Sequence, residues 1–408
     1  MLLFENKQRK LLNILKLTGS PFKKFVSTGE IKEDLGVTQS RQELLYKIID
    51  IMEKNDNIIL PIIGKVGTGK THLYWALKHG FHNYNIVYLS LENVYKRFYY
   101  NTYSEFVENM GVGPLRNITN NLCNKWGATE RKFGFFHFAD IKKIRDSAYK
   151  EWNSYFEDKE ALNDAINAIT AHCLDPYKKV EAERWLLGDL MDFRDLSRLN
   201  LNYDLRKKNN AFTMLKILTE NAKINSILFI DDFEKVISIA GPIKEAEEEE
   251  EVFDPSWLYG AKTSPDKITA EKTLDKILEL YKIKGLRIII TLKSLEFFNE
   301  IKSKIKEKNG SLLSIVKEPI FLSNFLIDDI FQFYKKSIEY FFGGINYLDY
   351  SIDFPNSSDY YPLNKKTLEY IYNTTKGNPR EIIKLLIKIF NEIISSNENI
   401  EDILKKYQ

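Results

Sequence analysis

The feature that most constrains this chain is the octapeptide Gly64-Lys65-Val66-Gly67-Thr68-Gly69-Lys70-Thr71, which has the pattern G-x-x-x-x-G-K-T. It directly follows an apolar run at residues 58–63 and directly precedes a helix-like stretch. In such a strand–loop–helix setting, the glycines let backbone N–H groups curl inward around phosphate groups, and the new helix adds its positive end. The pattern therefore predicts a phosphate-binding loop, the P-loop (residues 64–71), between a buried strand and a helix.

Lys70 and Thr71 carry the chemistry of this loop. In this pattern the lysine supplies a point charge to the β- and γ-phosphates, and the threonine hydroxyl ligates Mg²⁺. We also expect His72, the next residue, to belong to the nucleotide site. A glycine-rich turn that binds nothing is the competing interpretation, and the flanking strand and helix patterns disfavour it. No guanine-reading N-K-x-D sequence occurs in the chain, so we expect ATP and Mg²⁺ as cofactors.

Length and composition narrow the class of protein. The 408 residues, 44% of them hydrophobic, are enough for two or three globular domains. A formal net charge of +2 gives no overall basic field that would indicate nucleic acid. Cys123 and Cys173 are far apart and lack C-x-x-C spacing, so we expect neither a disulfide framework nor a zinc site. Without a membrane-length apolar run or a signal-peptide core, the sequence predicts a cytoplasmic protein with no membrane partner.

Strand and helix patterns alternate over the first three quarters of the chain, which predicts an α/β fold with a parallel sheet. After the first strand, the expected strands are residues 85–91, 226–230, 286–291 and 319–322. Residues 92–225 have apolar positions at helical spacing and few strand signals, so they predict a large helical insertion.

The remaining segments complete the expected domain organisation. Residues 1–34 form a basic arm and short helix, for which packing on the core is favoured over contact with a partner or DNA. Residues 244–267, with a run of five glutamates, predict a mobile acidic surface loop within an ATPase core at 35–323. Beyond Asn324 the pattern is wholly helical, which predicts a lid domain at 324–408 whose final helix follows the sequence G-N-P-R at 377–380.

A second signature ends the strand at 226–230. Asp231 and Asp232 follow it directly, and ligands of open α/β sheets lie beyond the carboxyl ends of the strands. Asp231 is therefore expected to face the Mg²⁺ held by Thr71, and a neighbouring carboxylate to orient or deprotonate the attacking water. An ordinary strand ending in a polar turn is the competing interpretation.

The order of these motifs says more than any one of them. A P-loop, an acid-tipped strand, a strand ending in Thr291 with Lys293 close behind, and a helical lid opened by G-N-P-R together resemble the AAA+ and STAND classes of P-loop ATPases. Within these classes the sequence is most similar to the initiator-type ATPases of origin recognition and to the ATP-binding proteins of bacterial BREX phage-defence islands. The resemblance covers residues 35–395.

The resemblance implies roles for individual residues. Lys70 and Thr71 match the Walker A phosphate and Mg²⁺ ligands, and Asp231 matches the Walker B metal aspartate. Asp232 stands where AAA+ proteins usually carry a glutamate base, and Glu234 is the alternative base. STAND proteins often carry Asp-Asp here, which implies slow hydrolysis.

The same resemblance implies four further roles. Thr291 is similar to a sensor 1 residue, and Lys293 to the basic residue of the STAND T-x-R motif. Arg380 is similar to the sensor 2 arginine of the lid, and Arg41 to the box that frames adenine. An arginine on a separate lid that touches the γ-phosphate acts as a switch, because loss of that phosphate removes a charge-assisted contact.

Two departures from the family pattern matter. Residues 299–317, where a ring-forming AAA+ enzyme places its arginine finger, contain lysines but no arginine. Lysine lacks the planar fork that clamps a transferring phosphoryl group, so a trans-acting finger and an obligate ring motor are in doubt. Few residues of this sequence follow the expected lid, so we do not expect it to include the winged-helix domain of origin-binding relatives.

The leading hypothesis is an ATP-binding, slowly hydrolysing switch that regulates a protein partner or a DNA-associated assembly. One alternative is a STAND-type signalling scaffold that stores nucleotide with negligible turnover, and a less favoured one is a P-loop kinase. DNA binding is left open without a dedicated motif, and oligomerisation is left open as well.

Overall fold

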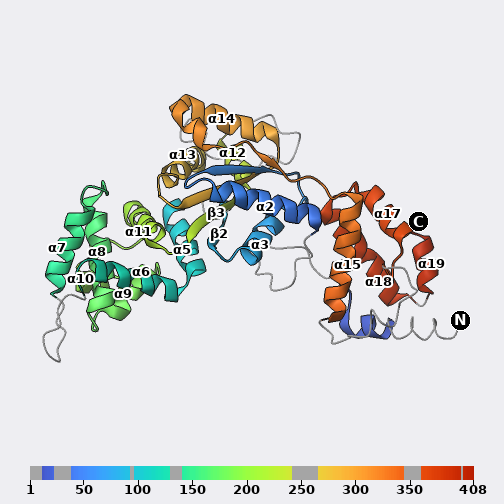
Figure 1. Cartoon of the computed structure of the whole chain (residues 1–408), viewed down its shortest axis with the longest axis horizontal. Helices are drawn as coiled ribbons and strands as arrows, with labels where there is room; N and C mark the ends of the chain where they lie inside the picture. The colour runs from blue at the N-terminus through green and yellow to red at the C-terminus, as the bar shows by residue number, and fades with distance from the viewer. Residues whose placement is uncertain are drawn as a thin grey trace, which may run out of the picture. The chain divides into compact units, whose positions relative to one another are not determined.

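A computed structural model describes residues 12–22, 38–91, 96–128, 140–240, 265–343, 360–396 and 398–408 (Figure 1). Within these residues the strands form one five-stranded parallel sheet in the order β2-β3-β4-β1-β5. The strands are β1 (Ile59–Ile63), β2 (Tyr84–Ser90), β3 (Asn225–Asp231), β4 (Leu286–Leu292) and β5 (Ile320–Phe321). The expected α/β fold with a parallel sheet is confirmed.

The strands form where the sequence supplies continuous branched apolar residues. Every residue of β1 and β4 is buried, and in β3 only Asn225 is exposed. Parallel strands are covered on both faces, so they need apolar side chains at every position rather than at alternate ones. The register pairs Ser90 of β2 with Asp231 of β3, and Ile230 of β3 with Ile290 of β4.

Contacts between residues divide the chain into two compact units, which are described separately. The loop–lid unit comprises Met1–Lys54, Ile62–Gly80 and Pro319–Gln408. The insertion unit comprises Asn55–Pro61 and Phe81–Glu318.

The loop–lid unit is mainly helical. Its helices are α2 (Gln39–Glu53), α3 (Lys70–Gly80), α15 (Ile327–Gly343), α17 (Lys365–Thr375), α18 (Pro379–Ser395) and α19 (Ile400–Lys405). The expectation that α18 is the final helix is wrong, because α19 follows it. Asn399 caps α19 by accepting from the Glu401 N–H, a short local signal that periodicity over a longer window does not detect.

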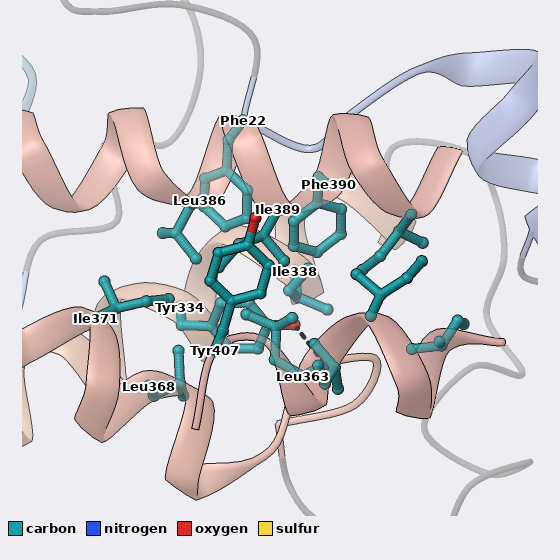
Figure 2. Close-up of a cluster of buried hydrophobic side chains, with 14 of the residues drawn as sticks. Phe22, Tyr334, Ile338, Leu363, Leu368, Ile371, Leu386, Ile389, Phe390 and Tyr407 are labelled. Atoms are coloured by element: carbon teal, nitrogen blue, oxygen red, sulfur yellow. Dashed lines mark hydrogen bonds between the residues drawn. The ribbon is translucent and has the colours of Figure 1, made fainter. Parts of the chain in front are cut away.

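One aromatic and aliphatic cluster holds the C-terminal helices together. Figure 2 shows Phe22 packed among lid side chains, with its ring centroid 5.3 Å from that of Phe390 and 6.0 Å from that of Tyr334. Leu15, in a short helix at residues 12–18, is fully buried in the same cluster. Residues 12–22 therefore pack on the helical core, in agreement with the favoured interpretation of the N-terminal segment. The rest of the expected 1–34 arm lies outside the described residues.

The insertion unit carries the expected helical insertion. Between β2 and β3 the described residues form helices and turns: α5 (Phe98–Met110), α6 (Val112–Lys125), α7 (Ile141–Trp152), α8 (Lys159–Leu174), α9 (Lys179–Leu186), α10 (Phe193–Leu199) and α11 (Lys208–Asn221). Tryptophans anchor their packing. Trp126 and Trp152 meet edge to face at 4.9 Å, and the buried Trp185 donates its indole N–H to the Tyr203 carbonyl.

The other helices of this unit are α12 (Phe233–Ala240), α13 (Pro265–Leu280), α14 (Leu295–Asn309) and the 3₁₀ helix η2 (Gly310–Ile315). The expected acidic loop extends three residues too far. Pro265 already opens α13, because proline fits the first helical position, where no N–H is needed. Residues 241–264 lie outside the described residues. No helix in the described ranges is both long and apolar enough to cross a bilayer.

Candidate functional site

The P-loop has the turned backbone that its glycines predict. Gly67 has φ +85° and Gly69 has φ +100°, values that favour glycine because it has no Cβ. Thr68 closes the turn by donating both its N–H (3.2 Å) and its hydroxyl (2.8 Å) to the Lys65 carbonyl. A Cβ on Gly64 would lie only 2.6 Å from the Thr68 hydroxyl oxygen. All three glycines are therefore required by backbone conformation or by space.

The loop leads into the positive end of a helix. Lys70 is the first residue of α3, and its ammonium group donates to the Gly64 carbonyl at 3.0 Å, which holds the charge over the loop. Thr71 and His72 follow in the first turn and are partly exposed. That turn contains no acidic residue, so the partial positive charge of the helix end is not neutralised there. These groups fit the phosphates of a nucleotide.

The G-N-P-R segment contacts the P-loop directly. The Asn378 side-chain amide donates to the Val66 carbonyl at 3.0 Å, and the Arg380 N–H donates to the Gly67 carbonyl at 3.2 Å. A Cβ on Gly67 would lie 2.5 Å from the Asn378 amide oxygen and 3.0 Å from the Arg380 Cβ. The first turn of α18 thus rests against the loop.

Asn378 has two functions at this contact. While its amide N–H₂ group binds the loop, its amide oxygen accepts from the N–H groups of Arg380 (3.1 Å) and Glu381 (3.4 Å) and caps α18. Arg380, the expected sensor, has an exposed side chain. Sequence reasoning missed Asn378, although an asparagine directly before a proline at the start of a helix is a capping signal.

Arg41 of α2 also contacts the P-loop. Its guanidinium group donates to the carbonyls of Thr68 (3.2 Å) and Ser323 (2.5 Å) and lies 5.2 Å from the Phe325 ring centroid. Burial lowers the pKa of Arg41 to about 10, against the opposing effect of the Asp329 carboxylate. The group remains a cation at neutral pH. It joins α2, the loop and the segment that leads from β5 into the lid helices.

In the insertion unit, Asp231 at the end of β3 is buried and held by three donors. The hydroxyl of Thr291, on β4, donates to Asp231 Oδ1, and the Asp232 N–H donates to the same oxygen at 3.1 Å. The hydroxyl of Tyr88, on β2, donates to Asp231 Oδ2 at 3.0 Å. Knowledge of the strand register would have identified Tyr88. β2 is the neighbour of β3, and Tyr88 lies two residues before Ser90, the residue that pairs with Asp231.

Asp232 has an unusual backbone and an ion-pair partner. Its φ of +54° places a non-glycine residue in the left-handed region, which aspartate tolerates better than most residues. Its N–H also lies 3.1 Å from the Thr291 hydroxyl oxygen, and its carboxylate lies 3.2 Å from the Lys235 ammonium group. Glu234 lies in the first turn of α12, and Lys293 is exposed beyond β4.

The sequence-predicted residues therefore fall into two groups. The loop–lid unit contains the P-loop, His72, Arg41 and Arg380, and the insertion unit contains Asp231, Asp232, Glu234, Thr291 and Lys293. Within the described ranges no cluster of three or more His, Cys, Asp or Glu forms a metal cage. A nucleotide-bound Mg²⁺ needs only one or two protein ligands, because phosphates and waters supply the rest. Thr71 of the loop–lid unit and Asp231 of the insertion unit each carry an oxygen of the kind that Mg²⁺ takes, and each stays a predicted ligand.

Comparison with known proteins assigns no family. No protein-family model matches the chain, and a search of curated proteins gives no match.

Proposed function

We propose that this chain is an ATP-binding, slowly hydrolysing switch of the AAA+/STAND type that regulates a protein partner. The observation that carries the proposal is the pair of hydrogen bonds from Asn378 and Arg380 to the carbonyl groups of Val66 and Gly67. A ligand that reorients the loop changes these bonds. The nucleotide state of the loop is therefore coupled to the start of α18.

In this proposal each charged group has a defined task. Lys70 and the loop N–H groups would hold the phosphates, and Thr71 and Asp231 are the proposed Mg²⁺ ligands. The metal would supply positive charge that neutralises the phosphates. Arg380 is the charged group expected to read the γ-phosphate, because its backbone is already bonded to the loop and its side chain is exposed. Arg41 holds the loop to the segment before the lid helices.

Three features support an ATPase of this class over a P-loop kinase. β3 ends in Asp231, a helical segment follows far along the chain, and its G-N-P-R sequence contacts the P-loop.

A nucleotide-storing scaffold with negligible turnover is the second candidate, and one observation favours it. The Asp232 carboxylate is paired with Lys235 at 3.2 Å. A carboxylate oxygen that is engaged by an ammonium group is less available to accept a hydrogen bond from an attacking water. This pair supports slow hydrolysis in either case.

The test compares nucleotide binding and steady-state phosphate release in the wild-type chain, in Lys70→Ala and in the matched control Lys47→Ala, which removes an exposed lysine of α2. We expect Lys70→Ala to lower ATP affinity by about tenfold or more and to abolish weak turnover, with the control unchanged. Binding without turnover, with or without DNA, would select the scaffold. Phosphate transfer to an acceptor, or equal ATP affinity in all three proteins, would overturn the proposal.

A further inference from the structure

Helices α6 and α8 of the insertion unit pack against each other and carry the two cysteines, and α9 packs against α8 (Figure 1). Cys123 on α6 is buried, Cys173 on α8 is partly exposed, and each thiol shifts the pKa of the other. The Cys123 thiol also lies 3.8 Å from the Ile169 carbonyl, one turn before Cys173. The sequence predicted neither a disulfide framework nor a zinc site, and both cysteines are free thiols. Their proximity was not predicted, because spacing along the chain does not reveal which faces of two packed helices meet.

A chain of polar groups ends at this thiol pair. The ring of His172, 2% exposed, has its Nδ1 3.1 Å from the Thr119 hydroxyl and its Nε2 3.3 Å from Glu183 Oε2. Arg116 binds both carboxylate oxygens of Glu183, at 2.8 and 2.9 Å. A carboxylate on one ring nitrogen fixes the orientation of a buried imidazole. The proposed nucleotide chemistry uses none of these residues.

The surroundings of the two thiols make them chemically unequal. The hydrogen bond from Cys123, together with those from His172 and Thr119, lowers the pKa of Cys173 despite its burial. The same pairing, together with burial, raises the pKa of Cys123. The thiolate is the nucleophile in thiol chemistry, so Cys173 is suited to attack and Cys123 to react second.

We propose that Cys173 and Cys123 form an oxidant-sensitive dithiol that closes to a reversible disulfide across α6 and α8. The Cys173 thiolate attacks one oxygen of a hydroperoxide, so an S–O bond forms, the O–O bond breaks, and the leaving oxygen takes a proton to give water or an alcohol. The Cys123 thiol then attacks the sulfenic sulfur, forming the S–S bond and releasing the sulfenic oxygen as water with the Cys123 proton. A dithiol reductant restores both thiols. The proposal stands independently of nucleotide binding.

Hydrogen peroxide is the probe, applied to the full chain and followed by intact-protein mass and thiol counting. We expect the wild-type protein to lose two hydrogen atoms and both thiols together, as a monomer, and to recover them with dithiothreitol. Cys123→Ser should instead accumulate a sulfenic acid that dimedone traps at residue 173. Cys173→Ser should react about tenfold more slowly than wild type.

A matched pair of variants tests the contribution of the polar chain. Thr119→Val removes the hydroxyl that hydrogen bonds with His172 and that helps to lower the pKa of Cys173, and should slow the oxidation several-fold, whereas Thr119→Ser should keep the wild-type rate. If a variant does not fold, the oxidation rate of the folded wild-type protein still tests the proposal. It is then compared with the oxidation rate of the wild-type protein unfolded in urea. Independent reaction of the two thiols at the unfolded rate, or disulfides only between chains, would overturn the proposal.

Discussion

The P-loop and the acidic end of β3 are stabilised in different ways. The loop offers main-chain carbonyl groups, and its partners Arg41, Asn378 and Arg380 come from segments far away in the sequence. Asp231, by contrast, is a buried carboxylate bound by side chains of the strands on either side of its own. The positions of donors on neighbouring strands are fixed by the backbone hydrogen bonds of the sheet, whereas a loop bonded to the end of a helix can exchange its partners. The difference indicates that the acidic pair is a rigid element and the loop contact is the element able to switch.

The largest effect is expected from removing the charge of the rigid element. Asp231→Asn keeps the size of the side chain but removes the expected Mg²⁺ ligand. Phosphate release should fall by about 100-fold, and ATP affinity should lose its dependence on Mg²⁺. Titrations with ATP in the presence and absence of Mg²⁺ measure this. If the dependence persists, Asp231 is not the metal ligand.

A second test separates the contact between loop and lid from the conformation of the loop itself. Gly67→Ala and Gly69→Ala both place a side chain at positive φ, which costs about 1 kcal/mol each. Only at Gly67 does the new Cβ collide with Asn378, since the nearest atom at Gly69 lies 3.8 Å away. We expect Gly67→Ala to lower the free energy of unfolding by about 2–4 kcal/mol and Gly69→Ala by about half of that or less. Equal losses in urea unfolding would mean that the lid contact contributes nothing.

A smaller effect should come from Asn378, whose two functions can be separated. Asn378→Ala removes both the helix cap and the donor to Val66, and should cost about 1–2 kcal/mol. Asn378→Asp keeps the cap but lacks the donor, so it should recover most of the stability while weakening ATP binding by repulsion of the phosphates. Unfolding curves and ATP titrations of the two variants test this separation. Identical behaviour of both variants would contradict it.

The smallest effect is expected at Tyr88. Tyr88→Phe removes one of the donors that hold Asp231 and should cost about 1 kcal/mol, the typical contribution of one hydrogen bond. Tyr155→Phe, at an exposed tyrosine of the same unit, is the control and should change nothing. Urea unfolding compares the two. If Tyr88→Phe left the free energy of unfolding unchanged, the Tyr88 hydroxyl would not contribute to holding the Asp231 carboxylate.

Local patterns predicted much of the fold, while packing determined most of what they missed. The strand runs, the octapeptide and the acid pair are contiguous signals, and the meeting of Asp231 with Thr291 follows from two parallel strands that end at the same edge. The contact of Asn378 with Val66 and the pairing of Cys123 with Cys173 depend on how helices pack, which no window of sequence encodes. The starts of α13 at Pro265 and of α19 at Ile400 depend on a single residue at a helix end.

The position of Phe22 in the aromatic cluster has a consequence for synthesis of the chain on the ribosome. Leu15 and Phe22 leave the ribosome before their partners Tyr334 and Phe390, which are made about 310 to 375 residues later. At a synthesis rate of about 5–20 residues per second, these two apolar side chains stay without their packing partners for tens of seconds. The core of the C-terminal helices is therefore complete only after the last helix has been made and residues 12–22 have packed against it.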